Sequence, residues 1–148
     1  MAKHILITGA TGLVGKSLVS SLQKSGYQLS ILSRKQQAIK DVKVYLWDVN
    51  QQTINKNCMN GVDTIIHLAG EGIGDKKWTE ERKKQIIDSR VLSTNLLYRT
   101  IKETNANVKS FISASAVGFY GDRGEEILTE DSPMGNGFLA ECCHKWET

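Results

Sequence analysis

The sequence of 148 residues has little cysteine, a single proline and no long apolar run. Its cysteines, Cys58, Cys142 and Cys143, are odd in number and lack the spacing of a disulfide framework or a zinc site. No apolar run approaches the roughly 20 residues of a membrane-spanning helix, and nothing after Met1 resembles a signal peptide. We therefore expect no metal, no membrane partner and a cytoplasmic location.

Charge of either sign is not concentrated in this sequence. The formal net charge is +3, and no dense stripe of Lys and Arg is interleaved with aromatic residues. This balance is typical of a solvated surface and does not predict a nucleic-acid partner. With 40% hydrophobic residues the composition is that of an ordinary globular protein, and the length fits one domain over residues 1–148.

Short apolar runs alternate with helical patterns along the chain. The runs predict strands and the patterns predict helices, and Thr79 is suited to cap the long helix. This alternation predicts an α/β protein with a parallel sheet. The expected strands are residues 3–8, 28–33, 42–47, 63–69 and 109–113, and the expected helices are residues 12–25, 51–58, 79–104 and 138–148.

Gly9, Gly12 and Gly15 separate the first predicted strand from the first predicted helix. With this spacing the first glycine permits a tight turn, the second lets a pyrophosphate approach the backbone, and the third lets the helix pack on the strand. The pyrophosphate then accepts hydrogen bonds from N–H groups at the helix N-terminus. The pattern predicts a Rossmann-type doubly wound parallel sheet, with five of its usual six strands in this sequence.

The predicted helix from Phe138 to Thr148 has no glycine, asparagine or proline to end it. Together with the missing sixth strand, this favours the N-terminal part of a longer protein whose substrate-binding part lies beyond Thr148. The alternative is a small complete domain with a frayed last helix. An apolar face with Phe138, Leu139 and Trp146 also predicts self-association, as in a homodimer.

The end of the second strand bears on the choice between NAD and NADP. An NAD site usually has Asp or Glu there, whereas this sequence has Ser33, Arg34 and Lys35. Arg34 can pair with a 2′-phosphate and stack on adenine, and Ser33 can donate a hydrogen bond to that phosphate. We therefore expect NADP(H) in preference to NAD. The alternative is that Arg34 and Lys35 are ordinary loop charges.

Several motifs carry a family resemblance, namely residues 7–15, 47–48, 67–70, 113–115 and 120–121. In these the sequence resembles the extended short-chain dehydrogenases/reductases, the NAD-dependent epimerase/dehydratase family. Residues 69–71, 78–79, 89–91, 113–121 and 137–147 narrow the resemblance to an atypical subgroup of epimerase-family proteins of poorly defined function. The loop and the resemblance together imply cofactor contacts at Thr8, Gly9, Thr11, Gly12, Leu13, Val14, Gly15, Ser33, Arg34, Lys35, Asp48, Leu68, Ala69, Gly70, Ser113 and Ala114.

The catalytic Tyr-x-x-x-Lys pair of that family is missing at its expected place. A tyrosine with a pKa of about 10 needs a nearby ammonium to transfer a proton at neutral pH, but Phe138 and Leu139 stand where the tyrosine is expected. The spacing from Tyr98 to Lys102 occurs inside the long helix and is interpreted as a coincidence.

Other residues near the expected cleft are candidates for the missing proton transfer. Ser115 and Tyr120 are the candidate catalytic residues, although one alignment puts Ala116 at the position of the family serine. Glu71 and Glu141 are further substitutes, and for each of these a structural role is the simpler interpretation. His67 is interpreted as a core or strand-end residue.

Two functions follow from these observations. The first is the NADP(H)-binding domain of an epimerase or oxidoreductase that acts on a nucleotide-linked or other small substrate with unusual acid–base groups. The second is a non-catalytic module that senses or binds NADP(H). The missing Tyr/Lys pair favours the second, and the family resemblance favours the first.

Overall fold

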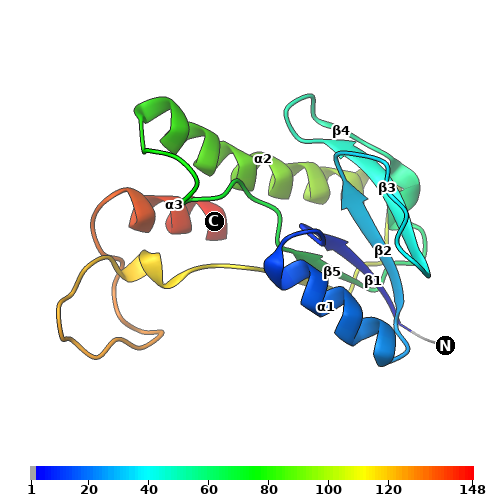
Figure 1. Ribbon diagram of the computed structural model, residues 1–148, viewed down its shortest axis with the longest axis horizontal. Coiled ribbons are helices and arrows are strands. Elements are labelled where there is room, and N and C mark those ends of the chain that lie inside the picture. The colour runs from blue at the N-terminus through cyan, green and yellow to red at the C-terminus, as the bar shows by residue number, and fades with distance from the viewer. Residues whose placement is uncertain (1–2) are drawn as a thin grey trace. The chain divides into compact units, whose positions relative to one another are not determined.

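The computed structural model describes residues 3–148, which form both strands and helices (Figure 1). The strands are β1 His4–Thr8, β2 Gln28–Ser33, β3 Val42–Asp48, β4 Thr53–Ile54, β5 Thr64–His67 and β6 Ser110–Ser113. The helices are α1 Leu13–Lys24, α2 Glu80–Thr104 and α3 Phe138–Glu147, with short 3-10 helices η1 Lys56–Met59 and η2 Val117–Tyr120.

The six strands form one sheet in the order β4-β3-β2-β1-β5-β6. The pairs β1–β2, β2–β3, β1–β5 and β5–β6 are all parallel, so the predicted parallel α/β class is confirmed. All five predicted strands are present. The two-residue strand β4 adds a sixth, which runs antiparallel to β3.

Apolar side chains cover both faces of this sheet. Every residue of β1 is buried, as expected for a central strand of a parallel sheet. On one face Leu6 and Ile65 belong to a core cluster with Leu96 of α2. On the other face Ile7 clusters with Val19 of α1. Alternate residues of β1 therefore serve two cores, and the strand is held from both sides.

The helix predicted over residues 51–58 is wrong. Thr53 and Ile54 instead pair with β3, where Ile54 lies opposite Trp47. The side chain of Asn55 then accepts a hydrogen bond from the N–H of Asn57 at the start of η1. Pairing with a neighbouring strand and a local asparagine cap outweigh the weak helical propensity of this short segment.

The chain divides into two compact units, which are described separately here. The sheet unit comprises the residues up to Gly70 and Leu92–Ala114. The second unit comprises Glu71–Val91 and Ser115–Thr148. The sheet unit contains the whole sheet and α1, and the second unit contains η2 and α3.

Candidate functional site

In the sheet unit, the chain order reverses at β1, which lies between β2 and β5 (Figure 1). In parallel sheets such a reversal opens a crevice at the carboxyl ends of the two central strands, where ligands bind. The glycine loop follows β1 and the segment Leu68–Gly70 follows β5. Both therefore begin at the edge where a ligand is expected.

The glycines of the loop are constrained by the backbone around them. Gly9 has a φ of +69°, and a Cβ there would lie 2.7 Å from the carbonyl carbon of Leu68. A Cβ on Gly15 would lie 2.3 Å from the carbonyl oxygen of Gly9. A Cβ on Gly12 would meet that same oxygen at 3.3 Å, a tight but much milder approach. The fold itself thus requires Gly9 and Gly15 far more strictly than Gly12.

The N-terminus of α1 faces the same loop. Gly12 is its N-cap, no side chain caps the helix, and no acidic residue lies in its first turn. The exposed fractions of Leu13 and Val14 are 90% and 65%. A helix start without a cap or an acid favours an anion, because its first N–H groups lack partners within the helix and its dipole is positive there.

At the end of β2, Ser33 organises the turn that carries Arg34. The Ser33 hydroxyl donates to the carbonyl of Lys35 at 2.8 Å, and it accepts from the backbone N–H of Lys35 and from the side-chain amide of Gln37. Its only proton is therefore used within the turn. The side chains of Arg34 and Lys35 are exposed.

The other predicted contact residues lie at the carboxyl ends of their strands. Asp48 ends β3, and its carboxylate accepts the N–H of Gln51 at 2.9 Å. The hydroxyl of Ser113 donates to the carbonyl of Ala114, whose N–H donates to the carbonyl of His67. Thr11 is exposed, whereas Thr8 is fully buried, so the Thr8 side chain engages the protein interior.

In the second unit, aromatic packing surrounds Phe138, the residue that the sequence resemblance aligns with the expected tyrosine. The ring of Phe138 packs on Trp78 with 5.1 Å between ring centroids, and the ammonium of Lys83 lies 5.8 Å from its centre. Trp146 lies under the guanidinium of Arg90, 4.7 Å from the ring centroid. Much of the apolar face predicted for α3 is thus covered within its own unit.

The two candidate catalytic residues are not joined to each other. The hydroxyl of Ser115 donates to the carboxylate of Glu147. Tyr120 lies in η2, where its ring packs edge-on against Phe119 at 5.3 Å between centroids. Within residues 3–148 the Tyr120 hydroxyl makes no hydrogen bond, and no basic group is bonded to it.

The two candidate glutamates are held in ion pairs. Glu141 accepts from Lys145 at 2.6 Å, and this hydrogen bond and charge hold the pKa of Glu141 below its ordinary value. Glu71 accepts from buried Arg82 at 3.1 Å, and Arg82 also donates to the carbonyl of Gly72. The contact with Lys145 favours the ionised carboxylate of Glu141, which is a poor proton donor. Nothing in the sequence pattern marks Arg82 as buried, so its contacts with Glu71 and Gly72 could not be predicted from the sequence.

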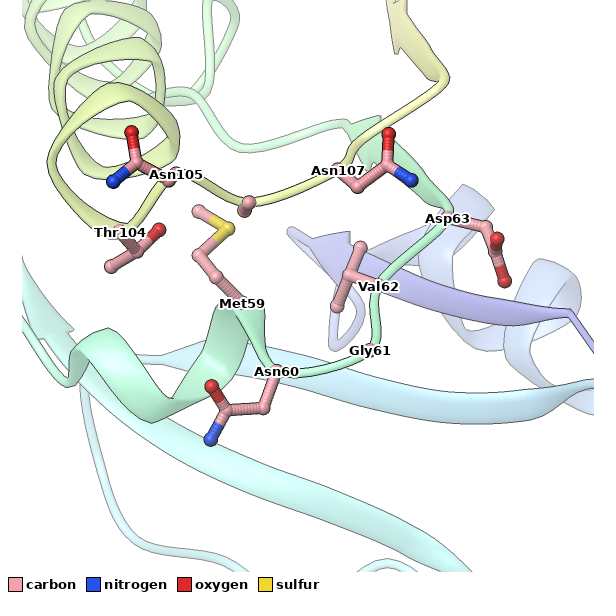
Figure 2. A pocket seen from close by; sticks show the side chains of 9 residues that line it. Met59, Asn60, Gly61, Val62, Asp63, Thr104, Asn105 and Asn107 are labelled. Atoms are coloured by element: carbon pink, nitrogen blue, oxygen red, sulfur yellow. The ribbon is translucent and has the colours of Figure 1, made fainter.

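The sheet unit also has a cavity of about 340 Å³ at the amino ends of β5 and β6 (Figure 2). Its walls are the two turns that precede these strands, residues 59–63 and 104–107. Figure 2 shows the amide side chains of Asn60, Asn105 and Asn107 around it. The cavity lies at the opposite edge of the sheet from the glycine loop and so does not belong to the cofactor site.

Among residues 3–148, no three His, Cys, Asp or Glu side chains are grouped as a metal ion would need. Over the same residues, none of the helices combines the length and apolar character required to cross a bilayer.

The fold and the glycine loop define a Rossmann-type NAD(P)-binding domain. The sequence model of the NAD dependent epimerase/dehydratase family matches residues 5–138, and the chain belongs to this family. The chain is 34% identical over 149 residues to the "epimerase family protein SDR39U1 homolog, chloroplastic" of Arabidopsis thaliana, covering 97% of this chain and 43% of that relative.

Solved structures give the same assignment. A nucleoside-diphosphate sugar epimerase from Corynebacterium glutamicum has a TM-score of 0.80 and 40% identity, covering 99% of this chain and 30% of that one. The human epimerase family protein SDR39U1, solved with NADPH, has a TM-score of 0.78 and 25% identity, covering 97% and 47%. The chain spans less than half the length of each of these relatives.

Proposed function

We propose that this chain binds NADP(H) on the glycine loop, as the cofactor-binding part of an epimerase or oxidoreductase that acts on a nucleotide-linked sugar or another small molecule. One observation carries the proposal. The glycine loop leads into a helix without a cap, and of the three loop glycines Gly12 is the one that the fold itself requires least. A pyrophosphate against the backbone at Gly12 explains why a residue without Cβ stands there.

The preference for NADP(H) over NAD(H) rests on the β2 tip. Arg34 and Lys35 are exposed beyond Ser33, and the human relative was solved with NADPH. Arg34→Ala should weaken NADP(H) binding about tenfold to a hundredfold, because a charge-assisted contact is worth roughly 1.5–3 kcal/mol. Binding of NAD(H) should hardly change.

Isothermal titration calorimetry with NADPH and NADH tests this preference. Lys102→Ala, which removes a positive charge from α2, is the matched control and should leave both affinities unchanged. Equal affinity of the parent chain for the two cofactors would refute the assignment of NADP(H).

The substrate class has separate support. The Corynebacterium relative, 40% identical, is described as a nucleoside-diphosphate sugar epimerase. Transfer of a deuterium label from NADPH to a carbonyl compound, followed by mass spectrometry, tests for chemistry of any kind.

A non-catalytic NADP(H)-binding module is the second candidate function. Phe138 stands at the position of the family tyrosine and packs on Trp78, and Glu71 and Glu141 are tied to cations. Label transfer distinguishes the two functions, because a pure binding module exchanges no hydride.

The remaining expectations concern assembly and compartment. The homodimer has a weaker basis than the sequence suggested, since Phe138 and Trp146 have partners within the second unit. Static light scattering measures the assembly state directly.

A cytoplasmic location remains part of the proposal, because Cys58, Cys142 and Cys143 are all free thiols, as is usual in a reducing compartment.

A further inference from the structure

Three fully buried polar side chains meet behind the glycine loop. They are Thr8 at the end of β1, His67 at the end of β5, and Ser93 in α2. The Thr8 hydroxyl lies 2.6 Å from Nδ1 of His67, and the Ser93 hydroxyl lies 3.0 Å from Nε2. We refer to these three side chains as the relay.

The hydrogen bonds of Thr8 fix where the protons of the relay lie. Its hydroxyl oxygen also accepts the backbone N–H groups of Leu68 and Ala69, each at 3.1 Å, and the Leu68 N–H is shared with the backbone carbonyl of Thr8 at 3.2 Å. A hydroxyl has two acceptor lone pairs and one proton, so two accepted bonds leave that proton for Nδ1 of His67. His67 thus accepts at Nδ1, and in the neutral ring Nε2–H donates to Ser93.

The relay ties together the two segments that flank the proposed cofactor site. Thr8 immediately precedes Gly9, and Leu68 and Ala69 immediately follow His67. The backbones of these segments touch, because a Cβ on Gly9 would lie 2.7 Å from Leu68. An imidazole with its proton on Nδ1 would compete with the two amides for the Thr8 oxygen and loosen this junction.

We propose that His67, protonated on Nε2, is a positioning residue that orients the Thr8 hydroxyl and thereby holds the glycine loop and Leu68–Ala69 at the spacing that the dinucleotide requires. This inference rests on the proposed NADP(H) site. It assigns His67 no contact with the cofactor, since its side chain is fully buried between Thr8 and Ser93.

Two substitutions of His67 distinguish the role of Nδ1 from the role of Nε2. The side-chain oxygen of Asn occupies the place of Nδ1, and the amide nitrogen of Gln occupies the place of Nε2. His67→Asn should keep the acceptor for Thr8 and stay within about threefold of the parent affinity for NADPH. His67→Gln should keep only the Ser93 bond and bind about tenfold more weakly, a difference of about 1.4 kcal/mol. A purely space-filling role would give the reverse order, because Asn is smaller than Gln.

Thr8 offers a second matched pair. Thr8→Ser keeps the hydroxyl and should bind NADPH nearly as the parent chain does. Thr8→Val keeps the shape but removes the hydroxyl acceptor of the Ala69 N–H, whereas the Leu68 N–H keeps the backbone carbonyl of Thr8. This variant should bind NADPH at least about tenfold more weakly. Thermal melting followed by circular dichroism establishes that each variant is folded before it is titrated.

Nitrogen-15 NMR of the parent chain without cofactor tests the proton assignment independently of any variant. The expected spectrum shows an unprotonated Nδ1 and a protonated Nε2 on His67, and the opposite tautomer would overturn the inference. If His67→Gln and Thr8→Val both bind NADPH as tightly as the parent chain, the positioning role is overturned. The proposed function then still stands. If the parent chain shows the expected tautomer but binds no dinucleotide, the proposed function is overturned, and the positioning role with it.

Discussion

At the scale of single residues, Gly12 differs from its two neighbours in the loop. Gly9 and Gly15 are required by contacts within the protein. A Cβ at these positions would lie 2.7 Å and 2.3 Å, respectively, from the nearest backbone atom. Gly12 has a φ of −74° and a ψ of 177°, which any residue can adopt. A substitution at Gly12 therefore probes the ligand more than the fold.

Gly12→Ala should fold with little change in melting temperature and bind NADPH at least about tenfold more weakly, because its methyl group lies where the pyrophosphate must approach. Calorimetry and thermal melting measure the two effects. Gly15→Ala is the comparison and should lose stability, since its Cβ would lie 2.3 Å from the oxygen of Gly9. Parental affinity in Gly12→Ala would move the pyrophosphate away from this loop.

His4 makes stability depend on pH. Its side chain is buried, and this burial lowers the pKa of His4 below its ordinary value of 6.5, partly opposed by backbone hydrogen bonds to Asn60 and Gly61 and by the charge of Asp63. As the pH falls below 6.5, the unfolded chain binds a proton that the folded chain does not. The free energy of unfolding attributable to His4 is therefore fully present above that pH and decreases below it.

Urea denaturation at pH 7.5 and pH 5.5 measures this dependence. In the structure Nε2 of His4 lies 2.9 Å from the hydroxyl of Ser30, and the amide of His4→Gln can replace that contact without titrating. The parent chain should lose more stability between the two pH values than the variant. Equal losses in both chains would exclude His4 as the source.

At the scale of elements, α2 begins where its sequence predicts. Thr79 precedes its first residue Glu80, and the Thr79 hydroxyl accepts the N–H of Arg82 at 3.2 Å. Glu80 and Glu81 lie in the first turn, where the helix dipole favours negative charge. Thr79→Ala should lower the free energy of unfolding by about 1 kcal/mol. Urea denaturation measures the loss, and Thr79→Ser, which keeps the cap, should show almost none of it.

Strands with strong local patterns could be predicted, whereas elements that depend on a distant partner could not. β1 is apolar throughout and buried throughout, so its sequence suffices. β4 exists because Ile54 lies opposite Trp47 on β3, and nothing within residues 51–58 encodes that pairing. The tight loop between β1 and α1 was likewise predictable from its three glycines. The use of the Ser33 proton within its own turn was not, because it depends on the backbone position of Lys35.

At the scale of the whole molecule, binding and chemistry place different demands on the chain. The sheet unit carries the glycine loop, the β2 tip and the Leu68–Gly70 segment. In the second unit the hydroxyl of Ser115 is bonded to Glu147, and Glu141 is bonded to Lys145. Proton transfer near neutral pH needs a group poised between its two protonation states, and the bond to Lys145 lowers the pKa of Glu141 away from that range.

We therefore expect the 148-residue chain to bind NADPH and to show no turnover by itself. Steady-state absorbance assays with NADPH and a panel of aldehydes, ketones and nucleotide sugars should give no rate above background. A rate that survives Tyr120→Phe and Ser115→Ala would reveal a catalytic group elsewhere in the chain. A rate abolished by either substitution would assign that residue to the chemistry.

The buried cysteines make the opening of each unit measurable by thiol alkylation. Cys58 is fully buried in the sheet unit, and burial raises its pKa to about 12. Cys142 and Cys143 are buried in the second unit, and burial raises the pKa of both thiols as well. Because only a thiolate reacts quickly, an alkylating reagent modifies these residues when their unit opens to water. The sheet unit gains one adduct and the second unit gains two, so the mass of a partly labelled chain records which unit opened first.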